Sequence, residues 1–229
     1  MARKARRKSV PRPVSRSKPE RERIVDAFMA LLAEKSFERI GFAEIAAAAD
    51  VSLSDLRGTF PSTLAILAAQ IKETDRAVLA GGDTDMAEEP PRERLFDVLM
   101  RRLEVLAPNK AAVRSLMRSV SRNPGLALAL NSLGVRSQQW MLTAADIGAS
   151  GPRGLLRAQG LALLFASVLR TWINDEDEGL APTMAALDRA LARGQRWSGF
   201  LDDLFRIPAS ACRLRRRGRR DEDEDTVRA

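Results

Sequence analysis

Apolar residues recur along this chain at the spacing of buried helical faces, and the first clear case lies near the N-terminus. One face of a helix with about 3.6 residues per turn collects Ile24, Ala27, Phe28, Leu31 and Leu32. Proline suits a first helical turn, so we expect this helix to begin at Pro19 and to end near Ser36. Strand-type alternation and Asn-Gly or Asp-Gly hairpin turns are absent from the sequence. The pattern predicts an all-α protein.

Two short helices joined by a tight turn are predicted next. The first covers residues 44–48, and residues 49–51 make the turn. Ser52 is placed to cap the second helix, and Asp55, three residues later, is placed to return a hydrogen bond to the Ser52 backbone. A longer helix is expected over residues 62–79. Two short helices and a turn, with a longer helix on either side, form a helix-turn-helix arrangement.

A short acidic segment rich in Gly and Pro, residues 81–91, separates this module from a second helical region. Apolar periodicity and helix breakers beyond it predict helices over residues 92–106, 110–121, 125–147, 153–173 and 181–206. The expected organisation is an arm over residues 1–18, a helix-turn-helix domain over 19–80, a linker over 81–91, a helical domain over 92–208 and a charged, disordered tail over 209–229.

The composition lacks most of the side chains that catalysis and metal binding use. There is no His and no Tyr, and the only Cys is Cys212. Four consecutive acidic residues, Asp175 to Glu178, lack metal-ligand spacing, so we expect them to form a solvated loop. We predict a protein that is not an enzyme and that uses no metal or cofactor.

Positive charge is concentrated at the N-terminus. The formal net charge is +8, and residues 1–18 hold no acid and eight basic residues: Arg3, Lys4, Arg6, Arg7, Lys8, Arg12, Arg16 and Lys18. Subtracting them from the 38 basic residues leaves 30, which equals the number of acidic residues, so the rest of the chain is neutral. Such an arm either solubilises the protein or contacts nucleic-acid phosphates, and composition alone leaves both readings open.

The chain shows no signal for a membrane or for secretion. No apolar run approaches the roughly 20 residues of a membrane span, and the N-terminus lacks the apolar stretch of a secretory signal. Its acid-free opening has some features of an organelle transit peptide, but Pro11 and Pro13 interrupt an amphipathic helix there. We therefore expect a cytoplasmic protein.

Residues 23–67 resemble the DNA-binding domain of TetR/AcrR-type transcriptional repressors. The matching positions are Ile24, Ala27, Phe28, Phe42, Ile45, Ala46, Ala49, Val51, Ser52, Leu56, Phe60, Pro61, Ser62 and Leu67. In that family the second short helix enters the major groove of DNA, and the C-terminal helices form a ligand cavity and a dimer interface. The resemblance implies operator contacts by Ser52, Ser54, Asp55, Arg57, Thr59 and Thr63. It also implies that residues 92–208 bind a ligand and dimerise.

Two of these positions depart from the family pattern. Arg57 stands where the family usually has Tyr, and Thr63 stands where it usually has Lys; both positions are usual phosphate contacts. Residues 20–72 also carry six basic residues against eight acidic ones. Because phosphate neutralisation dominates DNA affinity, we expect the N-terminal arm to supply the positive charge.

The C-terminal half resembles a second family with the same fold, the ubiquinone-biosynthesis accessory proteins that bind an isoprenoid lipid. The matching positions are Arg94, Arg101, Arg102, Leu103, Leu106, Ala107, Pro108, Ala112, Thr171, Trp172, Asp175, Thr183, Met184, Leu187, Asp188 and Arg189. Members of that family have given up DNA binding and present the lipid to a membrane-associated hydroxylase, so membrane contact is expected only under this reading. The segment after Pro208 lacks an obvious amphipathic helix for membrane docking.

Candidate ligand-binding residues are apolar and aromatic side chains of the middle C-terminal helices. They are Leu99, Leu103, Leu116, Met117, Leu130, Trp140, Met141, Leu164, Phe165, Val168 and Trp172. Apolar pockets between helices are a common form of binding site, although side chains at this spacing also serve as plain core. The last helix carries Met184, Leu187, Leu191, Trp197, Leu201 and Phe205 roughly along one face. That stripe predicts a homodimer, with packing inside the monomer as the alternative.

These observations favour a ligand-responsive, dimeric DNA-binding regulator, a repressor whose partners are operator DNA and a small apolar effector. The alternative is a lipid- or isoprenoid-binding accessory protein whose helix-turn-helix no longer binds DNA. The two readings share the fold and differ in what the first domain does.

Overall fold

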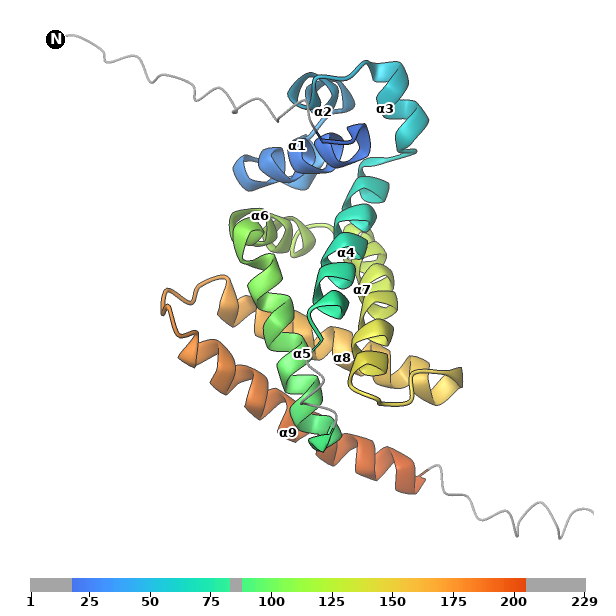
Figure 1. Ribbon diagram of the computed structural model, residues 1–229, viewed down its shortest axis with the longest axis vertical. Coiled ribbons are helices and arrows are strands. Elements are labelled where there is room, and N and C mark those ends of the chain that lie inside the picture. The colour runs from blue at the N-terminus through green and yellow to red at the C-terminus, as the bar shows by residue number, and fades with distance from the viewer. Residues whose placement is uncertain (1–17, 83–87, 205–229) are drawn as a thin grey trace, which may run out of the picture. The chain divides into compact units, whose positions relative to one another are not determined.

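The computed structural model describes residues 18–82 and 88–204, and within them the chain is helical and contains no strand (Figure 1). Its first half consists of α1 (Glu20–Glu34), the 3₁₀ helix η1 (Phe37–Arg39), α2 (Phe42–Ala49), α3 (Leu53–Thr59) and α4 (Thr63–Ala80). Its second half consists of α5 (Pro91–Leu106), η3 (Ala107–Asn109), α6 (Lys110–Val120), α7 (Pro124–Ala144), α8 (Gly151–Trp172) and α9 (Ala181–Leu204). The prediction of an all-α protein is confirmed, and the predicted helix ends lie within a few residues of the observed ones.

The helix-turn-helix forms as predicted, and local hydrogen bonds explain why. Asp50 ends α2 in the left-handed region, with φ 54°, and so turns the chain toward α3. Ser52 Oγ accepts a hydrogen bond from Asp55 N at 3.1 Å, and Asp55 Oδ2 accepts one from Ser52 N at 3.3 Å. Ser62 caps α4 by accepting from Ala65 N at 3.1 Å. These caps satisfy N–H groups that the first turn of a helix otherwise leaves unpaired.

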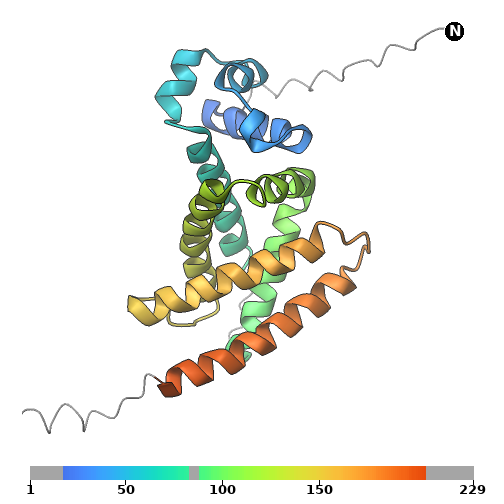
Figure 2. The ribbon, with the colours of Figure 1, turned by 180° about the vertical axis from the view of Figure 1, so that it is seen from behind.

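A buried apolar cluster holds α1 to α4 together, and Figures 1 and 2 show α1, α2 and α3 grouped around the N-terminal end of α4. Its fully buried large side chains are Ile24, Phe28, Leu32, Ile45, Leu56 and Ile66. Leu56 is the residue of α3 that is buried. The remaining side chains of this short helix therefore lie outside the core.

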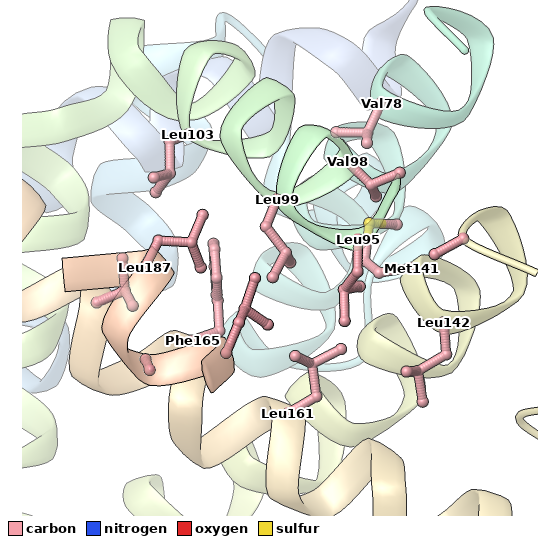
Figure 3. Packing of buried hydrophobic residues seen from close by; sticks show 14 of the residues in the cluster. Val78, Leu95, Val98, Leu99, Leu103, Met141, Leu142, Leu161, Phe165 and Leu187 are labelled. Atoms are coloured by element: carbon pink, nitrogen blue, oxygen red, sulfur yellow. The ribbon is translucent and has the colours of Figure 1, made fainter. Parts of the chain in front are cut away.

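A second apolar cluster lies among α4, α5, α7, α8 and the start of α9. Figure 3 shows Leu99, Leu161 and Phe165 directed into the same interior. Helix α4 contributes to both clusters, with Ile66 in the first and Val78 in the second. It therefore connects α3 directly to the interior of the C-terminal helices.

Helix α6 is attached to α1 on one side and to the corner between α8 and α9 on the other. Ser115 Oγ donates to the carbonyl of Lys35, at the end of α1, at 2.6 Å. At the opposite side, Lys110 Nζ donates to the carbonyl of Asp175 at 2.5 Å and lies 5.3 Å from the ring centroid of Trp172. Helix α6 thus links α1 to the corner between α8 and α9, although these elements lie far apart in the sequence.

The acidic segment 175–178 is not a solvated loop throughout, and that expectation is wrong for Asp175. Only 7% of this residue is exposed, and its Oδ2 accepts from Thr183 N at 3.0 Å and from Thr183 Oγ1 at 2.5 Å. The hydroxyl of Thr183 is the main cause that lowers the pKa of Asp175 below its ordinary value, assisted by the N–H of Asp177. Asp177 Oδ2 accepts from Ala181 N at 2.8 Å, so both carboxylates cap the first turn of α9.

The described residues up to Leu191 form one compact unit, and α9 continues beyond it to Leu204. In the predicted stripe on this last helix, Leu187 and Leu191 are buried and Met184 is 38% exposed. The side chains of Trp197, Leu201 and Phe205 lie outside the described residues. Among the described helices, none combines the length and the apolar character needed to cross a bilayer.

Candidate functional site

The residues expected to contact DNA lie on or beside α3, but the fold already uses some of their polar groups. Ser52 and Asp55 form the cap described above, in which Ser52 Oγ also lies 2.7 Å from Asp55 Oδ2. Ser54, in the first turn of α3, is exposed. Thr63 is half-buried at the start of α4. Ser52 and Asp55 therefore shape the start of α3, and Ser54 is left to face outward.

The C-terminal end of α3 is held by two further side chains. Arg57 Nη1 donates to the carbonyl of Pro61 at 3.1 Å. Thr59 Oγ1 donates to Glu20 Oε1, in the first turn of α1, at 3.0 Å. Thr59 thus joins the end of α3 to the point where the N-terminal segment enters the fold.

The first turn of α3 presents an exposed apolar side chain, Leu53, beside the exposed Ser54 and the capping carboxylate of Asp55, a feature that sequence reasoning missed. Leu53 is 56% exposed, and Gly58 has open space where a Cβ would lie. Phe42, the first residue of α2, is 46% exposed. Because Leu53 precedes Leu56 by three positions, the spacing is typical of one shared buried face and gave no sign that Leu53 is exposed.

Basic side chains of α1 support the turn between α2 and α3. Arg23 Nη1 donates to the carbonyls of Ala49 at 2.9 Å and Asp50 at 3.1 Å, where α2 ends. The guanidinium carbon of Arg21 lies 4.5 Å from the ring centroid of Phe60. Arg23 therefore joins α1 to the end of α2, and Arg21 joins α1 to Phe60, the residue after α3.

Two lysines near α1 are also paired with carboxylates. Lys18 Nζ lies 2.6 Å from Asp26 Oδ2, and this hydrogen bond is the main cause that raises the pKa of Lys18. Lys35 forms an ion pair with Glu44. The charges of these two lysines are therefore offset by carboxylates within the domain.

Most of the predicted ligand-binding residues lie inside the C-terminal helices. Leu99, Leu103, Met141, Phe165, Val168 and Trp172 belong to the buried cluster, and Met117 and Leu164 pack against it. Leu116 and Leu130 pack against the N-terminal cluster. Trp140 lies outside the interior, since it is 57% exposed, one helical turn after the exposed Arg136 on α7.

A buried ion pair crosses this interior. Arg102 Nη1 on α5 lies 2.5 Å from Asp75 Oδ1 on α4, which also accepts from Ser137 Oγ on α7 at 2.7 Å. The Arg102 guanidinium carbon lies 5.5 Å from the ring centroid of Phe165 on α8. Arg102 Nε and Gln138 Oε1 are buried without a hydrogen-bond partner among the described residues. The interior therefore offers one donor and one acceptor to a further polar group.

A hollow of about 580 Å³ lies between the end of α1 and α6. Its lining includes Lys35, Ser36, Ser115, Arg118, Ser119 and Arg122. None of the predicted ligand-binding residues lines this hollow. Most of the lining residues are polar or charged, and the hollow lies beside the Ser115–Lys35 hydrogen bond that attaches α6 to α1.

The helices are arranged as in solved structures of TetR transcriptional regulators. A TetR transcriptional regulator from Nitrosomonas europaea ATCC 19718 matches with a TM-score of 0.61 at 23% identity, over 78% of this chain and 99% of that chain. Another from Rhodococcus sp. RHA1 matches with a TM-score of 0.55 at 23% identity, over 76% of this chain and 95% of that chain. No protein-family model and no curated protein matches the sequence. The chain therefore has the TetR-type fold.

Proposed function

We propose that this protein is a DNA-binding transcriptional regulator in the cytoplasm, a repressor that responds to a small apolar effector. The observation that carries the proposal is the α2-turn-α3 unit, whose turn and capping box present α3 as a separate outward helix. In a helix-turn-helix, the second helix lies in the major groove and its N-terminal residues reach base edges. The TetR-type fold supports the same use of α3.

In this proposal the phosphate contacts come mainly from outside the described domain. Arg21, Arg23 and Lys35 are engaged in the fold and Lys18 is paired with Asp26, whereas residues 1–17 carry seven basic residues and no acid. This segment joins α1 beside the bond from Thr59 to Glu20, at the end of α3. Basic arms of this kind follow the groove or the backbone of DNA next to a reading helix.

The effector is proposed to occupy the interior of the C-terminal helices. Apolar side chains dominate that interior, while Arg102 Nε and Gln138 Oε1 provide unused polar groups that suit an apolar molecule bearing one polar group. Asp75, the partner of Arg102, lies on α4, whose N-terminal end follows α3. A molecule that disturbs this pair therefore changes the position of α3.

A homodimer is the proposed working form. On α8, Leu156 and Leu163 are 47% and 61% exposed, and Gly160 between them has open space at the position of a Cβ. An exposed apolar helix face with a glycine at its centre suits close packing against the same helix of a second copy. A two-fold dimer presents two copies of α3 to the two halves of a palindromic DNA site.

Selection of binding sequences from a random double-stranded DNA library, using the full chain, tests the proposal. We expect one palindromic sequence to be enriched. Ser54→Glu places a negative charge on the outward face of α3 and is expected to abolish enrichment. Ser132→Glu introduces the same change at an exposed position of α7 and is expected to leave it intact. Enrichment of no sequence, or equal binding by both variants, contradicts the proposal.

The acidic balance of residues 20–72 favours a second candidate, a lipid-binding accessory protein in which the helix-turn-helix does not bind DNA. It predicts an apolar molecule that co-purifies with the protein and no protected DNA sequence. Mass spectrometry of the organic extract of the purified protein, together with the DNA selection, separates the two candidates.

A further inference from the structure

The outward side of α3 carries an apolar residue at the position where a reading helix meets base edges. Leu53 is the first residue of α3, and 56% of it is exposed to solvent. Of the neighbouring polar side chains, Asp55 belongs to the cap, Arg57 is bonded to the carbonyl of Pro61 and Thr59 is bonded to Glu20. In the first turn, Leu53 and Ser54 are therefore the side chains left to meet a partner.

The backbone of α3 is also open to a close approach. At Gly58, one turn beyond Ser54 on α3, no atom other than those of its chain neighbours and its own helix backbone lies within 4 Å of where a Cβ would be. A glycine on an exposed helix face costs stability relative to alanine, because it loses more conformational freedom on folding. Its presence here leaves room for a surface that packs directly against the helix.

The charge surrounding this face favours DNA as the occupant. The chain that precedes Lys18 carries seven Lys or Arg and no acid. Lys18 and Pro19, which follow it in the sequence, precede α1, whose Glu20 is bonded to Thr59 at the end of α3. An exposed apolar side chain at the start of α3, in a chain that also carries this concentration of positive charge, fits a polyanion that exposes apolar groups. The major groove of DNA is such a surface, because thymine places its 5-methyl group there.

We propose that Leu53 reads thymine through its 5-methyl group and so makes this position of each half-site specific for an A·T pair. The inference rests on the proposed function. Cytosine, guanine and adenine offer no methyl group in the major groove, so Leu53 loses its apolar contact on those bases. Ser54, whose hydroxyl both donates and accepts, tolerates several neighbouring bases.

Replacing thymine by uracil tests this directly, since uracil keeps every hydrogen-bonding group and lacks only the methyl. The DNA is the palindrome selected with the full chain, and each thymine of a half-site is replaced in turn by deoxyuridine. Burial of one methyl group predicts about a fourfold loss of affinity at one thymine per half-site, and about sixteenfold when both half-sites are changed. Fluorescence anisotropy titrations measure both values.

Two variants assign the effect to its residue. Leu53→Ala is expected to bind the thymine and uracil DNAs equally, whereas Leu128→Ala, which changes a leucine that is 69% exposed on α7, is expected to keep the fourfold difference. Both positions are exposed, so neither change opens a cavity in the core.

The outcomes separate the inference from the proposed function. A selected palindrome that tolerates uracil at every thymine, or that contains no thymine, overturns the reading by Leu53 and leaves DNA binding in place. Equal uracil sensitivity in wild type and Leu53→Ala overturns it as well, because another residue then contacts the methyl. Enrichment of no sequence at all overturns both.

Discussion

The cap of α3 is made by polar side chains that bond to backbone groups a few residues away and stay near the surface. Ser52 and Asp55, three residues apart, form it. The polar cluster around Arg102, in contrast, is buried and joins side chains that are far apart in the sequence. Asp75 meets Arg102 across 27 residues and Ser137 across 62. The first set of bonds shapes a short helix at the surface, and the second ties helices together.

This difference decides what each region tolerates. A cap at the surface contributes about 1 kcal/mol, and water replaces it when it is lost. A buried ion pair that loses one member leaves a charge with neither water nor a partner, which costs several times more. The outward residues of α3 therefore tolerate substitution, whereas the buried ion pair does not.

The largest effect is expected from Asp75→Ala. It leaves the guanidinium of Arg102 buried, because only 6% of that side chain is exposed, and the expected loss is about 3–5 kcal/mol of unfolding free energy. Urea denaturation followed by circular dichroism measures it. The double variant Asp75→Leu with Arg102→Met is expected to recover most of the loss, since it removes both charges together. A loss below about 1 kcal/mol in the single variant contradicts the comparison.

An intermediate effect is expected from Thr183→Val, which removes the hydroxyl donor to Asp175. In the folded protein the pKa of Asp175 is lowered, so its carboxylate stabilises the fold above its unfolded pKa of about 3.9 and loses that contribution as pH falls through the folded value. The variant raises this pKa toward its ordinary value. Its stability is therefore expected to be lower at pH 7 and to fall less between pH 5 and pH 3.

Thr143→Val is the matched control for this experiment, because the Thr143 hydroxyl on α7 is exposed and donates to a backbone carbonyl of its own helix. Its pH dependence is expected to equal that of the wild type. Parallel pH curves for wild type and Thr183→Val would show that the α8–α9 corner does not depend on the Asp175 carboxylate.

The smallest effect is expected from Ser52→Ala, which removes the cap of α3 and costs about 1 kcal/mol. Ser54→Ala is its control, since Ser54 is exposed and outside the cap, and a change within about 0.5 kcal/mol is expected there. Thermal unfolding of the three proteins ranks them. Equal losses in both variants would mean that the cap seen at Ser52 does not hold α3.

The sequence predicted the local features of α2 and α3 correctly, but it did not predict the long-range buried contacts. The turn at Asp50, the cap at Ser52 and the helix ends rest on residues that are neighbours in the sequence, so their pattern could be read directly. The Asp75–Arg102 pair and the burial of Asp175 depend on which helices pack against each other. A local sequence pattern does not determine that packing, so neither could be predicted. The exposure of Leu53 was not predicted for a third reason. Its spacing from Leu56 is that of a core residue, but its place in the first turn of α3 leaves it exposed.

We propose that this chain binds DNA with α3 while residues 1–18 supply the positive charge. The most direct test of this proposal is the salt dependence of binding to the selected palindrome, measured for the full chain and for a chain that begins at residue 19. Each phosphate contact contributes about −0.9 to the slope of log affinity against log salt concentration, so removing eight basic residues is expected to flatten the slope by up to about seven. An unchanged slope would contradict the account.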